Sequence, residues 1–429
     1  MWPLLVAAMT VSAADVVPVV PFIEDDYRRA VQEARRRNLP LFIDTWAPWC
    51  HACASMHAFV YPDPALKEVA DQYVWLRINT ERPEAVHFLE KFPVEAWPTL
   101  LVFGPGGERP LARWVGSLSA SELVLRLKSL QEDHPHLPGQ KSSTEDLLRL
   151  AQLEEAAGRR AVAEDLYRRA LALEPHGEGR AAVAEPLIAI LESTHPRQCA
   201  HFGIEELPRL PQGTRYASVA ATTLSCALAT TSRDPDLVAK AEGPVRSAVD
   251  DPKSPLLADD RSALFALLVE ARRAAKDPKG VRKVAEQWAA FLETQAAAAR
   301  NPTARAVFDS HRLLAYEAAG QPERALPMLE QSEKDFPKDY NPPARRAGVL
   351  LKLGKPEEAL AAARRARSLV YGPRSLRVLL LEADALRELG RRNEAQKTLR
   401  DAESLVARLP APQRQPNLWK LLDDARRDM

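Results

Sequence analysis

The sequence has little net charge, few cysteines and few aromatic residues, and each shortage excludes a class of protein. Across 429 residues, 59 Lys and Arg nearly offset 58 Asp and Glu. This balance gives no electrostatic reason to expect nucleic acid or an acidic membrane as a partner. Four cysteines are too few for a disulfide-scaffolded secreted domain, so hydrophobic packing must supply the framework. With 35 prolines and only 6% aromatic residues, many short helices are expected, in two or three domains.

Long apolar runs are also lacking after the first residues. The stretch from Trp2 to Val11 is mostly apolar but too short for a transmembrane helix, and small residues follow it. We therefore expect a signal peptide over residues 1–13 and a periplasmic or secreted protein without an integral membrane segment. No Lys or Arg precedes Tyr27, so a first apolar strand of a cytoplasmic protein is the alternative.

Two of the four cysteines form a Cys50-x-x-Cys53 pair between an apolar stretch and a segment with a helical pattern. This layout is typical of reversible thiol–disulfide exchange. Backbone N–H groups at the helix start favour the thiolate of Cys50, and only a thiolate attacks a disulfide. Cys50 is therefore the predicted nucleophile and Cys53 the resolving cysteine. A protonated His51 would stabilise that thiolate and make the couple more oxidising; the alternative is an exposed histidine with little effect.

Helical and strand patterns alternate around this pair and then close with a hairpin and a helix, which indicates an α/β domain. Helices are predicted over residues 24–37, 50–60, 65–72, 84–91 and 119–130, and strands over residues 39–45, 73–78, 100–103 and 111–115.

The residues Trp-Ala-Pro-Trp-Cys-His-Ala-Cys, numbered 46–53, resemble the active-site motif of the thioredoxin-fold family. The resemblance extends to about residue 130 and includes Phe59 and the pair Asp63-Pro64. It implies a thioredoxin-like domain over residues 14–131. His-Ala replaces the Gly-Pro of thioredoxin itself between the cysteines, which leaves the redox direction open.

The same resemblance assigns further site residues. Asp44 would be a buried carboxylate under the cysteine pair that accepts the proton of Cys53. Trp97-Pro98-Thr99 would be the cis-proline loop, with Pro98 facing the sulfurs and its neighbours Trp97 and Thr99 at the substrate. Trp49 would flank the substrate surface. No lysine could be placed opposite the carboxylate.

After a linker predicted over residues 132–143, strand signals vanish and helices come in pairs. Four glycines are each followed five residues later by an alanine, at positions 158, 320, 354 and 390 for glycine and 163, 325, 359 and 395 for alanine. The spacing resembles the tetratricopeptide repeat, with a period of about 34 residues. An all-α solenoid is therefore expected over residues 144–429, with eroded repeats between Gly179 and Arg300.

The other cysteines and histidines give weaker signals. Cys226 lies in an apolar helix, Cys199 lies in a predicted loop between two histidines, and a bridge between them is possible. A zinc site of Cys50, Cys53 and His57 is an alternative that lacks a fourth ligand. No metal or prosthetic group is implied.

These patterns predict a thiol–disulfide oxidoreductase that acts on protein thiols and disulfides, with a redox partner protein that exchanges electrons with it. The solenoid would bind a client or partner protein beside the redox centre. The alternative is a non-catalytic scaffold or chaperone-like protein whose thioredoxin-like domain is an interaction module. A metal-handling protein is a third, weaker reading.

Overall fold

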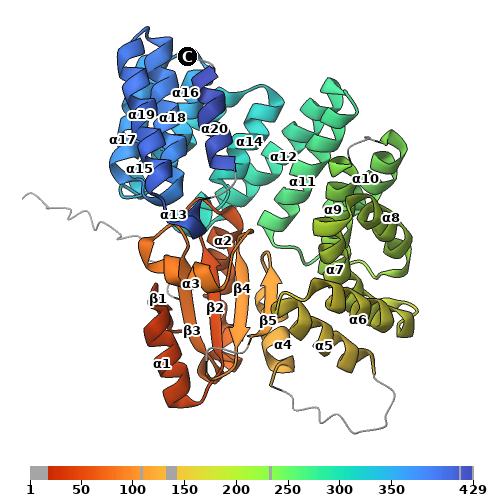
Figure 1. Cartoon of the computed structure of the whole chain (residues 1–429). Coiled ribbons are helices and arrows are strands. Elements are labelled where there is room, and N and C mark those ends of the chain that lie inside the picture. The colour runs from red at the N-terminus through yellow and green to blue at the C-terminus, as the bar shows by residue number, and fades with distance from the viewer. Residues whose placement is uncertain (1–17, 107–109, 132–142, 231–233, 415–416, 428–429) are drawn as a thin grey trace, which may run out of the picture.

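The computed structural model describes residues 18–106, 110–131, 143–230, 234–414 and 417–427. The predicted signal peptide over residues 1–13 and almost all of the predicted linker lie outside these residues. A sheet with helices on both faces comes first, and an arc of helices follows it (Figure 1).

The sheet has the strand order β1-β3-β2-β4-β5. Strands β1, β3 and β2 are parallel, whereas β4 and β5 are antiparallel to their neighbours. Its strands are β1 (Phe22–Glu24), β2 (Leu41–Trp46), β3 (Val74–Asn79), β4 (Thr99–Phe103) and β5 (Pro110–Val115). Helices cover both faces, as a parallel sheet requires, and the central strands are accordingly almost wholly buried.

Alternation along β2 sends its side chains into two separate cores. Leu41 and Ile43 pack with α1 (Tyr27–Arg37) and α3 (Val86–Lys91) on one face. Phe42 packs on the other face with the segment after the cysteines and with α4 (Ala120–Ser129). The cysteine pair therefore follows a strand that both cores hold in place.

Several predicted boundaries were wrong. The helix predicted from residue 24 begins at Tyr27, because Asp26 caps it, and the residues before it form the unpredicted strand β1. The helix predicted over residues 50–60 divides into α2 (His51–Ser55) and the π-helical η1 (Met56–Val60). The helix predicted over residues 65–72 consists of two short 3-10 helices.

From residue 143 onward, the described residues contain helices and no strands. The helices are α5 (Thr144–Ala156), α6 (Arg160–Leu173), α7 (Gly177–Thr194), α8 (Pro196–Glu206), α9 (Thr214–Ala229), α10 (Pro235–Asp250), α11 (Ala258–Ala274), α12 (Pro278–Ala298), α13 (Pro302–Ala306), α14 (Asp309–Ala319), α15 (Ala325–Asp335), α16 (Asn341–Lys352), α17 (Pro356–Leu369), α18 (Ser375–Glu388), α19 (Arg392–Arg408) and α20 (Asn417–Arg427), with the short 3-10 helix η8 (Ala411–Gln413) before the last. Every described helix is too short or too polar to span a bilayer.

The four glycines of the repeat pattern end the first helix of a pair in the same way. Gly158, Gly320, Gly354 and Gly390 all have positive φ, between 67° and 78°. After each glycine, the next backbone N–H donates to the carbonyl five residues earlier, and this bond closes the helix end. A Cβ would meet no atom within 4 Å at these positions, so the positive φ, and not a lack of space, favours glycine there. The alanines five residues later are fully buried between helices.

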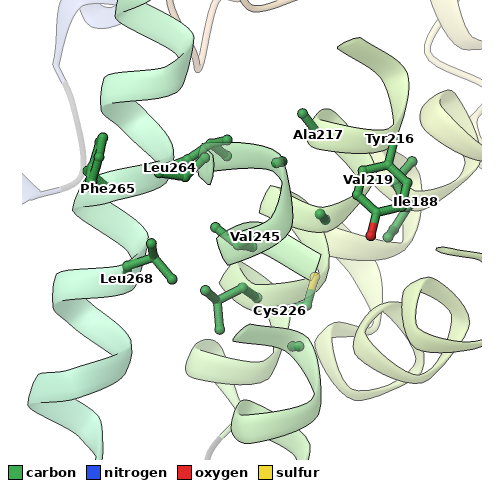
Figure 2. Packing of buried hydrophobic residues seen from close by; sticks show 14 of the residues in the cluster. Ile188, Tyr216, Ala217, Val219, Cys226, Val245, Leu264, Phe265 and Leu268 are labelled. Carbon is green, nitrogen blue, oxygen red and sulfur yellow. The ribbon is translucent and has the colours of Figure 1, made fainter. Parts of the chain in front are cut away.

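A second disulfide lies within the helical array, which is the set of helices from α5 to α20. Cys199 lies in α8, not in the predicted loop, and bonds Cys226 of α9. Its surroundings are an apolar core in which Cys226 lies near Val245 (Figure 2). The two helices approach so closely that a Cβ on Gly203 would come within 1.8 Å of the Thr223 hydroxyl oxygen.

The helical array meets the sheet region at both of its ends. Helix α5 packs against β5 at one end (Figure 1). At the other end Gln413 of η8 donates from Nε2 to the carbonyl oxygens of Thr80 and Arg82, each at 3.0 Å. Between these ends, α11 packs against α2, which carries the cysteine pair.

Candidate active site

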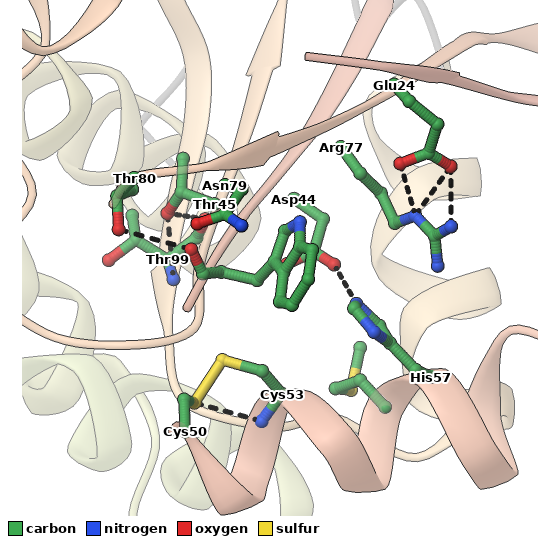
Figure 3. A network of polar contacts seen from close by, with 12 residues as sticks. Glu24, Asp44, Thr45, Cys50, Cys53, His57, Arg77, Asn79, Thr80 and Thr99 are labelled. Carbon is green, nitrogen blue, oxygen red and sulfur yellow. Dashed lines mark hydrogen bonds and ion pairs between the residues drawn. A yellow bond between two sulfur atoms is a disulfide. The ribbon is translucent and has the colours of Figure 1, made fainter. Parts of the chain in front are cut away.

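The cysteine pair lies at the start of α2, directly after β2. Cys50 is the N-cap residue and forms a disulfide with Cys53, with a Cα–Cα distance of 5.3 Å (Figure 3). The Cys53 backbone N–H donates to Cys50 Sγ at 3.0 Å. A first-turn N–H directed at this sulfur would stabilise a thiolate there. The two cysteines thus differ in local geometry, because a helix N–H contacts the sulfur of Cys50. The assignment of Cys50 as the nucleophile stays a prediction.

Asp44 of β2 is fully buried beside α2, and its partner is a histidine. Asp44 Oδ2 lies 3.0 Å from His57 Nε2, whereas Oδ1 has no hydrogen-bond partner (Figure 3). Burial, and then the negative charge of Asp44, raise the pKa of the neighbouring Tyr61 well above its usual value. His57 lies opposite Asp44, where the resemblance calls for a lysine. Its position four residues after Cys53, on one helix face, was the available signal.

The alternative zinc set of Cys50, Cys53 and His57 is not assembled in this disulfide form. The two sulfurs bond each other, and His57 Nε2 faces Asp44.

The loop before β4 has the expected cis peptide bond between Trp97 and Pro98. Trp97 packs edge-on against Trp49, with 5.1 Å between ring centroids, and donates from Nε1 to the Thr80 hydroxyl at 2.8 Å. Both rings border the small apolar cluster that contains the cysteine pair. The two tryptophans thus form one wall beside the disulfide.

Thr99 is buried, and its hydrogen bonds go to nearby residues of the sheet region. Its hydroxyl donates to the Ala96 carbonyl at 2.8 Å, and its backbone N–H donates to the Thr45 hydroxyl at 3.3 Å. The substrate contact that the resemblance implies for Thr99 stays a prediction.

The helical array borders this site from the side of Trp49. The Trp49 indole N–H donates to Glu81 at 3.0 Å, and the Arg374 guanidinium lies 4.9 Å from the centre of the Trp49 ring. The Arg374 backbone N–H donates to the other Glu81 oxygen, and burial raises the pKa of that carboxyl. Asn341 donates from Nδ2 to the Pro48 carbonyl at 3.0 Å. Only 5% of Cys50 and 1% of Cys53 are exposed.

His51, between the cysteines, contacts the array directly. Its Nδ1 lies 2.8 Å from Asp259 Oδ2 at the start of α11, and its ring centroid lies 3.8 Å from that of His311 in α14. Burial, and then proximity to His51, lower the pKa of His311 to about 3. The adjacent Asp260 accepts a hydrogen bond from the Ser117 hydroxyl, and burial raises the pKa of Asp260 to about 6. Sequence reasoning missed these partners because more than 200 residues separate them from His51 and no local pattern marks them.

Comparisons with known proteins agree with the sheet topology. Residues 23–105 match the family model described as thioredoxin-like. A segment of 110 residues is 31% identical to the thiol:disulfide interchange protein DsbD of Escherichia coli K12, and equally to that of Shigella flexneri serotype 5b. The match covers 25% of this chain and 19% of each relative, so the chain spans about a fifth of the length of these relatives.

Two solved structures resemble the chain more loosely. A tetratricopeptide repeat protein from Parabacteroides merdae covers 67% of this chain and all of its own, with 13% identity and a TM-score of 0.44. The Cut9–Hcn1 hetero-tetramer has 14% identity and a TM-score of 0.26 over 67% of this chain and 70% of its own. The repeat architecture therefore rests on the helix pairs and glycine turns described above. Residues 23–105 form a thioredoxin-like domain with a Cys-x-x-Cys pair, and a tetratricopeptide-like helical array follows it.

Proposed function

We propose that this protein is a thiol–disulfide oxidoreductase whose nucleophile is Cys50. One observation carries the proposal. The pair lies at a helix start, where the Cys53 N–H donates to Cys50 Sγ, so the geometry favours a thiolate at that position. The thioredoxin-like family match and the similarity to thiol:disulfide interchange proteins support the same chemistry.

In the reducing direction, the Cys50 thiolate attacks a client disulfide and forms a mixed disulfide, and the first client sulfur leaves as a thiolate. Cys53 then loses its proton and attacks Cys50 Sγ, which releases the second client sulfur. The client disulfide has gained two electrons, and Cys50 and Cys53 have become the disulfide. A dithiol redox partner then restores the reduced pair; the oxidising direction is the reverse.

We assign the remaining site residues roles that agree with their positions. Asp44, buried beside α2, accepts the proton of Cys53 during resolution, and His57 holds the carboxylate in place. The backbone edge at Pro98 pairs with the client chain, and Trp49 and Trp97 form the wall against which the client packs. His51 stabilises the Cys50 thiolate.

The helical array supplies a second binding surface for a client or partner protein. Because it covers the cysteine pair, a protein client must displace contacts such as that of Asn341 with the Pro48 carbonyl before exchange occurs. Binding to the array would raise the effective concentration of the client at the pair.

We also propose that the protein works in an oxidising compartment, periplasmic or extracellular. All four cysteines are paired, and the Cys199–Cys226 disulfide is buried in an apolar core where it has no evident exchange chemistry. Persistent disulfides of this kind are rare in the cytosol.

Reduction of insulin by dithiothreitol tests the activity. The full chain should accelerate insulin precipitation, and Cys50→Ser should return the rate to background. Cys226→Ser is the matched control, because it removes an equally buried cysteine from the other disulfide, and it should retain turnover. Wild-type protein that does not exceed the background rate would contradict the proposal.

A scaffold is the second candidate, and the near-complete burial of the cysteine pair favours it. In that case the wild-type chain would bind clients through its helices without turnover, and Cys50→Ser would leave client binding unchanged.

A further inference from the structure

Three side chains from distant parts of the chain converge beside the cysteine pair. His51 comes from α2, Asp259 from the first turn of α11, and His311 from α14, and one ligand atom of each lies within 4.8 Å of the others. We propose that this His51–Asp259–His311 cluster is a binding site for a divalent transition metal, with Zn²⁺ as the best match. The site shares His51 with the thiol chemistry proposed above, but metal binding does not depend on that chemistry.

One carboxylate oxygen in the cluster lacks the partner that its burial demands. Asp259 is 2% exposed, and its Oδ2 faces His51 Nδ1 at 2.8 Å. Its Oδ1 has no hydrogen-bond partner and lies 3.5 Å from His311 Nδ1. A buried, unpaired carboxylate oxygen is costly, and in proteins such groups are paired or bind metals.

Hydrogen bonds around His311 explain why its ring donates no proton to the Asp259 carboxylate. The Trp288 indole can only donate, so Ser262 Oγ accepts from it at 2.6 Å. The Ser262 hydroxyl proton is then free to point at His311 Nδ1, 2.7 Å away. That nitrogen then accepts the Ser262 proton and has none to donate to Asp259 Oδ1, which lies 3.5 Å away. The buried carboxylate oxygen therefore has no positive partner, and a bound cation would supply one.

The ligand types and spacing fit zinc. Zn²⁺ binds histidine nitrogen and carboxylate oxygen at about 2.0–2.2 Å, so neighbouring ligand atoms of a tetrahedral site lie about 3.3 Å apart. The two separations from the Asp259 oxygens, 2.8 Å and 3.5 Å, bracket that value. Two histidines and one carboxylate leave a fourth position for water. The Ser262 hydroxyl must turn its proton away from His311 Nδ1 when that nitrogen binds the ion.

An ion can reach the cluster from solvent. A cavity of about 540 Å³ is lined by His51, Trp288 and His311 together with Glu192, Glu270 and Glu317. The carboxylates along this cavity would attract a divalent cation.

A bound ion would join the two regions of the molecule at the active site. His51 lies between the two cysteines, whereas Asp259 and His311 belong to the helical array. Binding would therefore hold the array against α2 and stabilise the covered form of the cysteine pair.

The test uses the full chain in its disulfide form, so that no free thiolate can act as a ligand. After removal of metals with a chelator, isothermal titration with Zn²⁺ should give one bound equivalent, and Zn²⁺ should raise the melting temperature. His51→Ala and His311→Ala should each weaken binding by at least about 100-fold and abolish the melting shift. The exposed His87→Ala is the matched control and should bind as the wild type does.

His51→Ala keeps the test valid if the buried variants do not fold, because that side chain is about one-third exposed. Titration with Co²⁺ gives an independent readout, since visible absorption bands of a four-coordinate ion should develop in the wild type and not in His51→Ala. Less than one-fifth of an equivalent bound would overturn the proposal. Undiminished binding in both His51→Ala and His311→Ala would overturn it equally, because the ion would then occupy another site.

Discussion

The two disulfides of this chain close loops of very different length in very different surroundings. Cys50 and Cys53 are three residues apart at a strand–helix junction, with His51 between them and Trp49 and Trp97 beside them. Cys199 and Cys226 are 27 residues apart and join two packed helices in an apolar core. The same covalent bond can thus be a reagent or a structural link, and the difference lies in which polar groups and which backbone N–H groups surround it.

The two cysteine pairs should differ most in how their substitution affects turnover. Cys53→Ser should lower insulin reduction by about 1000-fold or more and leave the mixed disulfide at Cys50 unresolved. The double variant Cys199→Ala/Cys226→Ala should keep turnover within about twofold of the wild type. Non-reducing electrophoresis and mass spectrometry detect the trapped client. Clients trapped equally by the double variant would erase the distinction between the pairs.

The two disulfides should have the opposite order of effect on the free energy of unfolding. By loop entropy, removing the Cys199–Cys226 link should cost about 3.5 kcal/mol of unfolding free energy, whereas removing the Cys50–Cys53 link should cost about 2 kcal/mol. Urea titrations of the Cys199→Ala/Cys226→Ala and Cys50→Ala/Cys53→Ala variants measure both values. A larger loss from the active-site pair would show that its disulfide is the main structural link.

Access to the cysteine pair should depend on the contacts that hold the array in place. Gln413→Ala removes two hydrogen bonds to the sheet region, a loss of about 1–2 kcal/mol. In the reduced protein, Cys50 should then react several-fold faster with a bulky maleimide. Gln396→Ala, on the exposed face of α19, is the control and should leave the rate unchanged. An unchanged rate in Gln413→Ala would mean that this contact does not limit access.

The smallest expected effect is a pH dependence of stability caused by Glu81. This carboxylate accepts hydrogen bonds from the Trp49 indole and the Arg374 backbone N–H. Burial raises the pKa of Glu81 above its ordinary value of 4.5, so between these two values the folded state binds more protons than the unfolded state. The stability of the wild type relative to Glu81→Gln should therefore be greatest below pH 4.5, fall as the pH rises through the raised pKa, and stay constant above it. Denaturant unfolding across this range measures the difference. A difference that grew with pH would contradict the assignment.

Much of the sheet region could be predicted because its signals are local. The apolar stretch before Cys50 and the cysteine spacing placed β2 and α2, and the glycines of the repeats marked helix ends through their positive φ. Strand β1 was missed because its three residues carry too little pattern and a charged segment follows at once. The π-helical turn after α2 was missed because the same residues suit a regular helix.

The partners of the active site could not be predicted for a different reason. Asp259 and His311 reach His51 only because the array curves back over the sheet, and helical periodicity says nothing about that curvature. His57 was within reach of sequence reasoning, since it follows Cys53 by one helical turn. The same spacing also suits a zinc ligand beside the cysteines, and the resemblance calls for a lysine opposite Asp44, so neither points to a histidine there.

The array is attached to the sheet region through α5 at one end and through Gln413 at the other, so the two regions form a closed ring. A ring with two fixed attachments cannot change its pitch at one repeat without a compensating change elsewhere along its circumference. A protein that straightens or bends any repeat therefore exerts a mechanical load on the attachments, and the cysteine pair lies between them.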